Sequence, residues 1–140
     1  MAASIRFQSV IKRYPGVPPG APPALDGASF DVGPGEFVYL TGASGAGKST
    51  VFRLIAAIER PTGGVVLVNG QNIGALAGTA VPFLRRNLGL VLQDAKLLAT
   101  ALEGVASIEL AKDMDDAVQR AARAARSGET VLLSPACASL

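Results

Sequence analysis

The chain has 140 residues, 49% of them hydrophobic and 17% charged, and carries a formal net charge of +2. This length suits one small domain or parts of two, and the composition excludes intrinsic disorder as the default state. The small net charge gives no reason to expect a nucleic-acid partner. No apolar run approaches the roughly 18 residues that a membrane-spanning helix needs.

The sequence contains one cysteine, Cys137, and no histidine. A single cysteine excludes an internal disulfide and fits a reducing compartment. Without histidine, the chain has no Ser-His triad, no histidine acid–base catalyst and no His-liganded zinc. The first residues lack the apolar region of a secretory signal, so we expect a cytoplasmic protein.

Apolar alternation predicts two early strands, near 5–10 and 28–32. Between them, residues 15–23 are rich in Pro and Gly, which is typical of a loop and excludes a continuous hydrogen-bonded ladder. Residues 36–41 are short and mostly apolar and predict a buried central strand. We expect the early strands to join residues 65–68 in an antiparallel subsheet.

Residues 48–59 predict a helix, because their apolar side chains recur at helical spacing, at Val51, Leu54, Ile55 and Ile58. The Pro-Thr-Gly-Gly segment of residues 61–64 ends it. Residues 88–92 predict another apolar strand that shares a parallel core with residues 37–41.

Charge changes along the chain near residue 100. Residues 1–100 carry nine basic and five acidic side chains, whereas residues 101–140 carry four and six. The second segment predicts a helix over 113–126 and a last strand over 130–134. By the logic of parallel strands joined through a helix, we expect this pair to complete the parallel core beside residues 37–41.

The sequence from Gly42 to Ser49 matches the phosphate-binding pattern G-x-x-x-x-G-K-S and lies between a predicted strand and a predicted helix. Glycines let successive backbone N–H groups face a phosphate, and the helix N-terminus adds partial positive charge. Lys48 is then expected to reach the β- and γ-phosphates, Ser49 to ligate Mg²⁺, and Thr50 to contact the α-phosphate. The expected nucleotide-binding set is Gly42, Ser44, Gly45, Ala46, Gly47, Lys48, Ser49 and Thr50.

Two further residues have alternative interpretations. Gln93 follows the 88–92 strand and is either a solvated loop residue or, beside a phosphate loop, a ligand for Mg²⁺ and the attacking water. Tyr14 is either an aromatic that stacks on adenine or a half-buried anchor.

Residues 1–100 resemble the ATPase subunits of ABC transporters, and within them the subfamily that acts in bacterial cell division. The resemblance rests on three stretches, Thr41–Thr50, Ile58–Gly64 and Val81–Asp94. It implies that Tyr14 stacks on adenine, that Gly42–Thr50 hold ATP with Mg²⁺, and that Gln93 belongs to the Q-loop, with Lys48 and Gln93 as the catalytic residues. It also implies a second ATPase subunit and an FtsX-like integral membrane partner, with the chain on the cytoplasmic face of the membrane.

The chain departs from the family's pattern in the residues that drive hydrolysis. It has no Ser-Gly-Gly signature, no Asp-Glu pair after an apolar strand and no switch histidine. No carboxylate is therefore available to polarise the attacking water. We expect ATP binding with hydrolysis lost or very weak, so that assignment as an enzyme stays open.

Residues 101–140 have two interpretations. One is a degraded ABC segment, with Val131–Leu133 as the strand and Ser134-Pro135 where Asp-Glu is expected. The other, which the sequence favours, is a fragment that resembles the C-terminal domain of the Mur ligase that adds D-glutamate. It rests on the string Leu132–Ser139, in which Ser139 corresponds to a substrate-contacting serine.

The predicted fold is α/β. We expect a truncated P-loop NTPase of the ABC ATPase type over residues 1–100 and a helix–strand unit over 101–140. The alternative to an ATP-binding module is a non-enzymatic interaction fragment, or a non-functional product of a fused or truncated gene.

Overall fold

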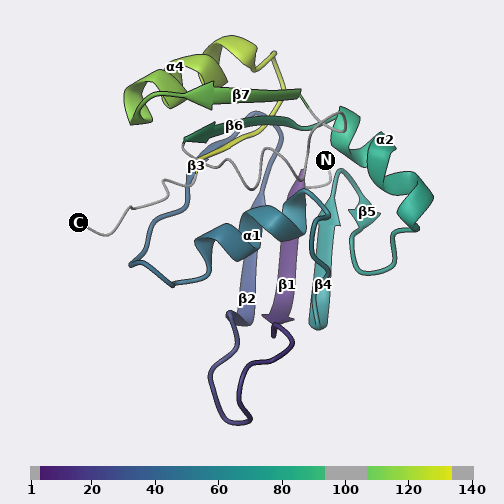
Figure 1. Ribbon diagram of the computed structural model, residues 1–140. Coiled ribbons are helices and arrows are strands. Elements are labelled where there is room, and N and C mark those ends of the chain that lie inside the picture. The colour runs from purple at the N-terminus through teal and green to yellow at the C-terminus, as the bar shows by residue number, and fades with distance from the viewer. Residues whose placement is uncertain (1–3, 94–106, 134–140) are drawn as a thin grey trace.

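The computed structural model describes residues 4–93 and 107–133. Its first layer is a four-stranded sheet in the order β2-β1-β4-β5 (Figure 1). The strands are β1 (Ile5–Lys12), β2 (Leu25–Val32), β4 (Gly63–Val68) and β5 (Gln71–Asn72). Each adjacent pair is antiparallel, which confirms the predicted N-terminal antiparallel subsheet.

The central strand β1 breaks the simple alternation of buried and exposed side chains halfway along. Ile5 and Phe7 are buried, and the next buried positions are Val10 and Lys12, one residue out of the simple alternation. The shift coincides with Ser9, which has φ 47° and lies at a break in the register with both neighbouring strands. A β-bulge of this kind lets a strand keep apolar side chains on one face.

The helix α1 (Lys48–Ile55) lies across one face of this sheet (Figure 1). Its buried side chains Val51, Leu54 and Ile55 join the sheet residues in one hydrophobic core. Phe7 is buried in that core, and its ring stacks on that of Phe30 with centroids 4.5 Å apart. This packing holds α1 against the sheet.

The predicted helix end was wrong by four residues, because α1 stops at Ile55 and not at residue 59. Ala57 has φ 53°, its N–H donates to the carbonyl of Leu54, and the N–H of Ile58 donates to the carbonyl of Arg53. These bonds form a Schellman motif that satisfies the last carbonyls. Ile58 therefore continues the apolar pattern from outside the helix.

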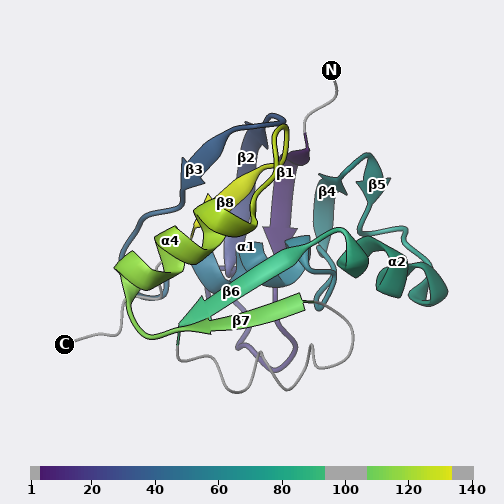
Figure 2. The same cartoon turned by 90° about the horizontal axis from the view of Figure 1, so that it is seen from above.

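The strand before the phosphate loop, β3 (Phe37–Tyr39), pairs in parallel with β8 (Val131–Leu133). This pairing confirms that the last strand lies beside the first strand of the parallel core. The helix α4 (Met114–Ala124) precedes β8 and contacts it (Figure 2). Its N-cap is Asp113, whose side chain accepts a hydrogen bond of 2.8 Å from the N–H of Asp116.

A separate parallel pair joins β6 (Gly89–Gln93) to β7 (Ser107–Ala111). In the described residues, β3 and β6 therefore lie in two separate parallel pairs, although residues 37–41 and 88–92 were expected to share one parallel core. The predicted boundary at residue 100 lies outside the described residues. Both described strands that follow it pair with strands that precede it.

Four elements of the described residues have no counterpart in the sequence prediction. They are β5, β7, the short 3₁₀ turn η1 (Gly78–Ala80) and the helix α2 (Val81–Arg86). Pro82 lies in the first turn of α2, where proline is favoured, so the sequence did contain a signal for this helix. Among the described residues, no helix has the length and apolar character needed to cross a bilayer.

Candidate phosphate-binding loop

The predicted phosphate loop runs from the end of β3 to the start of α1 and turns into the helix at Gly47. Gly47 has φ 93° and is the N-cap of α1. A Cβ at this position would lie 2.5 Å from the carbonyl oxygen of Ala24 and 2.8 Å from Cδ2 of Leu25. Only glycine fits both the left-handed backbone and this close approach to the start of β2.

The first turn of α1 presents backbone donors that have no acceptor within the helix. The first bond of the helix runs from the N–H of Val51 to the carbonyl of Gly47, at 3.0 Å, and no side chain caps the N-terminus. The N–H groups of Lys48, Ser49 and Thr50 precede that bond and have no acceptor within the helix. Together with the helix dipole, they form a site that favours an anion.

Lys48 is buried beneath the loop. Its Nζ donates hydrogen bonds to the carbonyl oxygens of Gly42 at 2.6 Å and Ala43 at 2.8 Å. The N–H of Ala46 donates to the same Ala43 carbonyl at 3.1 Å. The lysine thus ties the two ends of the loop together and places a positive charge next to the predicted phosphate position.

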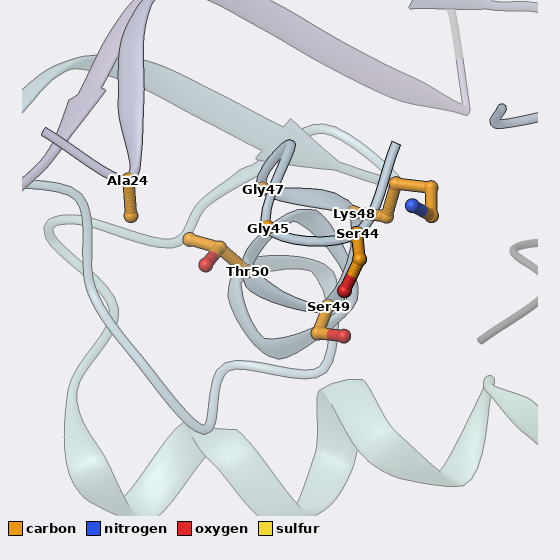
Figure 3. Close-up of a pocket in the computed structure, with 7 residues that line it drawn as sticks. All are labelled: Ala24, Ser44, Gly45, Gly47, Lys48, Ser49 and Thr50. Carbon is orange, nitrogen blue, oxygen red and sulfur yellow. The ribbon is translucent and has the colours of Figure 1, made fainter. Parts of the chain in front are cut away.

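The loop and the first turn of α1 enclose a hollow of about 220 Å³ (Figure 3). It is lined by Ala24, Ser44, Gly45, Gly47, Lys48, Ser49 and Thr50. Figure 3 shows Thr50 on the side of the helix that faces Ala24, and Ser44, Ser49 and Lys48 on the other side. The Ser49 hydroxyl is a hard oxygen donor of the kind that Mg²⁺ accepts alongside phosphate oxygens.

A second hollow, of about 230 Å³, adjoins the first and shares Ala24 and Gly45 with it. Its other lining residues come from the end of β1 and the Pro-rich loop, namely Arg13, Tyr14, Val17, Pro22 and Pro23. The Tyr14 hydroxyl lies 3.3 Å from Oγ1 of Thr50. An aromatic ring and apolar side chains therefore stand directly beside the phosphate loop.

The structure brings most of the predicted site residues together. Tyr14 meets Thr50, and Gly42, Ala46 and Lys48 are joined through the loop carbonyls. Gln93 ends β6, with its backbone opposite Ala111, and its side chain lies outside the described part of the structure. Cys137 and Ser139 also lie outside the described residues.

Sequence reasoning missed Ala24 and Arg13 as lining residues. Ala24 is brought to the loop by the pairing of β1 with β2, and the Arg13 guanidinium donates to the carbonyl of Ala21 at 2.8 Å. No local sequence pattern reveals these contacts. The Pro-rich composition of residues 15–23 predicted a loop but did not indicate that it lines the site.

The ABC transporter family model matches residues 25–136. The chain is 48% identical over 94 residues to the cell division ATP-binding protein FtsE of Escherichia coli K12, a match that covers 67% of this chain and 40% of that protein. It is 41% identical over 119 residues to FtsE of Mycobacterium tuberculosis, covering 83% of this chain and 50% of the relative. The chain thus spans about half or less of the length of these relatives.

Solved structures agree in fold. The dimeric ATP-binding cassette MJ0796, in a post-hydrolysis state bound to ADP and Pi, superposes with a TM-score of 0.58 at 28% identity, covering 66% of this chain and 40% of that chain. A bacterial Atm1-family ABC exporter with ATP bound gives a TM-score of 0.53 at 36% identity, covering 64% and 14%. The family match extends over most of the chain, including most of residues 101–140. The chain therefore belongs to the ABC transporter family, with the fold of part of its ATPase domain.

Proposed function

We propose that this chain is an FtsE-like ATP-binding module that holds Mg-ATP in the two adjoining hollows. The observation that carries the proposal is the continuity of an aromatic, apolar hollow with a phosphate loop through Ala24 and Gly45. One end suits a flat heterocycle and the other suits a chain of phosphates. The relatives' names, which include ATP-binding and cell division, support the same assignment.

In this proposal each residue type has a defined task. The N–H groups of the Gly42–Thr50 segment bind phosphate oxygens, and Thr50 lies nearest the α-phosphate. When the nucleotide binds, the Lys48 ammonium group leaves the carbonyl oxygens of Gly42 and Ala43 and binds the β- and γ-phosphates. Ser49 and Gln93 supply oxygen ligands to Mg²⁺, which offsets the phosphate charge when bound. Tyr14 stacks on the base.

We further propose that these 140 residues bind ATP with little or no turnover. Supporting this, their sequence contains no histidine and no Asp-Glu pair, so the side chains that polarise and receive a proton from water in this family are absent from it. Lys48 and Gln93 remain to orient the phosphates and the water. The rate expected is therefore far below that of a complete cassette.

By relation to FtsE and to a dimeric cassette, we propose a cytoplasmic-side location at a membrane, an FtsX-like membrane partner and a second ATPase subunit. The alternative, a non-enzymatic interaction fragment, keeps the membrane partner and dispenses with the nucleotide. The resemblance of residues 101–140 to a Mur ligase stays a prediction about origin, and no ligase activity forms part of the proposal.

The direct test is titration of the chain with ATP by calorimetry, with and without Mg²⁺. We expect one site per chain, weaker binding without Mg²⁺, a loss of the Mg²⁺ effect in Ser49→Ala, and no binding in Lys48→Ala. If the chain is instead a non-enzymatic interaction fragment, Lys48→Ala should leave docking to the membrane partner unchanged. ATP binding by Lys48→Ala with wild-type affinity would overturn the proposed site.

A further inference from the structure

Lys12 is a buried cation at the end of β1, outside the predicted nucleotide set. Its side chain is 7% exposed, and its Nζ donates to Oε2 of Glu59 at 2.8 Å and to the carbonyl of Arg60 at 2.9 Å. A buried ammonium group persists only where such partners replace water. Because Glu59 and Arg60 lie four and five residues beyond Ile55, the last residue of α1, Lys12 joins β1 to the segment that follows the helix carrying the phosphate loop.

The same ammonium group contacts the aromatic ring of the second hollow. Nζ of Lys12 lies over the Tyr14 ring, 4.9 Å from its centroid, which is cation–π distance. Tyr14 lines the hollow and Lys12 is not among its lining residues, so the cation meets the ring from outside. The Tyr14 hydroxyl is held independently, at 3.3 Å from Thr50.

We propose that Lys12, held by Glu59, is a positioning residue that fixes the Tyr14 ring for a nucleobase. The ring is constrained at two points, its face by Lys12 and its hydroxyl by Thr50, and it lines the hollow together with Pro22 and Pro23. Because the ring is already ordered, binding a base costs less conformational entropy. The inference rests on the proposed function, since it requires a nucleotide in the adjoining hollows.

The test separates base binding from phosphate binding. The affinities of the 140-residue chain for Mg-ATP and for Mg-tripolyphosphate are measured in Lys12→Met, which keeps the aliphatic stem and removes the charge. We expect ATP to bind about three- to tenfold more weakly, in line with a desolvated cation–π contact, and tripolyphosphate to bind as in the wild type. Lys12→Arg should restore most of the ATP affinity, because guanidinium also binds an aromatic face.

Three further variants control for loss of charge elsewhere, for misfolding and for effects that do not pass through Tyr14. Arg6→Met removes another ion-paired cation of β1, which pairs with Asp31 at 3.0 Å and lies away from Tyr14, and should change neither affinity. The double variant Lys12→Met/Glu59→Gln avoids leaving a buried carboxylate unpaired and serves if the single variant fails to fold. In a Tyr14→Ala background, Lys12→Met should have no further effect on ATP.

Failure of the positioning role and failure of the proposed function give different results. An equal loss of ATP and tripolyphosphate affinity in the Lys12 variants, or no loss of either, overturns the positioning role and leaves the proposed function standing. A wild-type chain that binds neither compound overturns the proposed function, and this inference with it.

Discussion

Gly47 holds the phosphate loop against the start of β2, and this predicts a specific sensitivity. In Gly47→Ala, the added methyl group meets the Ala24 carbonyl at 2.5 Å in a backbone with φ 93°, so both strain and overlap oppose folding. Left-handed backbone alone costs about 1–2 kcal/mol for a residue with a Cβ. We expect Gly47→Ala to lower the free energy of unfolding by about 3 kcal/mol, measured by urea denaturation, and to abolish ATP binding.

Gly45 provides the matched control. It has a similar φ of 80°, but nothing lies within 4 Å of a Cβ placed there. Gly45→Ala should therefore lower the free energy of unfolding only by the cost of a left-handed backbone, about 1 kcal/mol. Equal losses in the two variants would contradict the close approach of the loop to Ala24.

At the scale of the elements, Arg85 of α2 stabilises the end of α1. Its guanidinium donates to the carbonyls of Ala56 at 2.8 Å and Ala57 at 3.1 Å, which follow the last helical residue. Partial burial lowers the pKa of Arg85 from its ordinary value, and the group stays charged at neutral pH. A cation at a helix C-terminus also interacts favourably with the helix dipole.

Arg85→Met should lower the free energy of unfolding by about 1–2 kcal/mol, because two carbonyls lose a charged donor. Its neighbour Arg86 is exposed and lies over the Phe83 ring at 5.3 Å, so Arg86→Met should change stability by less than about 0.5 kcal/mol. Both values are measured by urea denaturation. A larger effect from Arg86 than from Arg85 would contradict the capping role.

The hydrogen bonds at the start of α4 predict that the stability of the fold depends on pH. Asp116 accepts hydrogen bonds from the N–H of Lys112 at 3.1 Å and from Arg120 at 2.9 Å, and these bonds lower the pKa of its carboxyl. The same hydrogen bond between Asp116 and Arg120 raises the pKa of Arg120, because it stabilises the charged guanidinium. Since the folded carboxyl has the lower pKa, its stabilising effect is present above the pKa of the unfolded chain, about 4, and is lost as pH falls through the folded value.

Asp116→Asn should therefore lower the urea midpoint at pH 7, and the difference from the wild type should shrink below about pH 4. Asp115→Asn, at an exposed carboxylate in the same turn, should have a smaller effect at pH 7. A difference between Asp116→Asn and the wild type that stayed constant from pH 7 to pH 3 would contradict this linkage.

The sequence predicted those elements whose conformation depends on residues close together in the chain. Alternation of apolar residues predicted the antiparallel sheet, and the spacing of Gly42, Gly47 and Lys48 predicted the loop between β3 and α1. The end of α1 was missed, because a left-handed alanine at position 57 ends the helix with no glycine to signal it. Lining residues such as Ala24 were missed, because only strand pairing brings them to the site.

At the scale of the whole molecule, β8 decides whether the strand before the phosphate loop is paired. The N–H of Val131 donates to the carbonyl of Glu36 at 3.1 Å, and the Thr130 hydroxyl donates to the carbonyl of Gly33 at 2.7 Å. An unpaired strand edge exposes backbone groups and invites aggregation. Residues near the end of the described chain therefore support the strand that leads into the phosphate loop.

Val131→Pro removes the Val131 donor and should lower the free energy of unfolding by about 3 kcal/mol, with weaker ATP binding. Thr130→Val removes only the hydroxyl bond and should cost about 1 kcal/mol. Unfolding is followed by circular dichroism in urea. If Val131→Pro left both stability and ATP binding unchanged, β8 would have no part in supporting the loop.

The measurement that tests the account most directly is thermal unfolding with and without Mg-ATP, in the wild type and in Lys48→Ala. We predict one cooperative transition whose midpoint rises with Mg-ATP in the wild type alone, since ATP at 100 times its Kd adds about 2.7 kcal/mol to the folded state. A wild-type midpoint that does not move with Mg-ATP, or that moves equally in Lys48→Ala, would contradict an ATP site built on this loop.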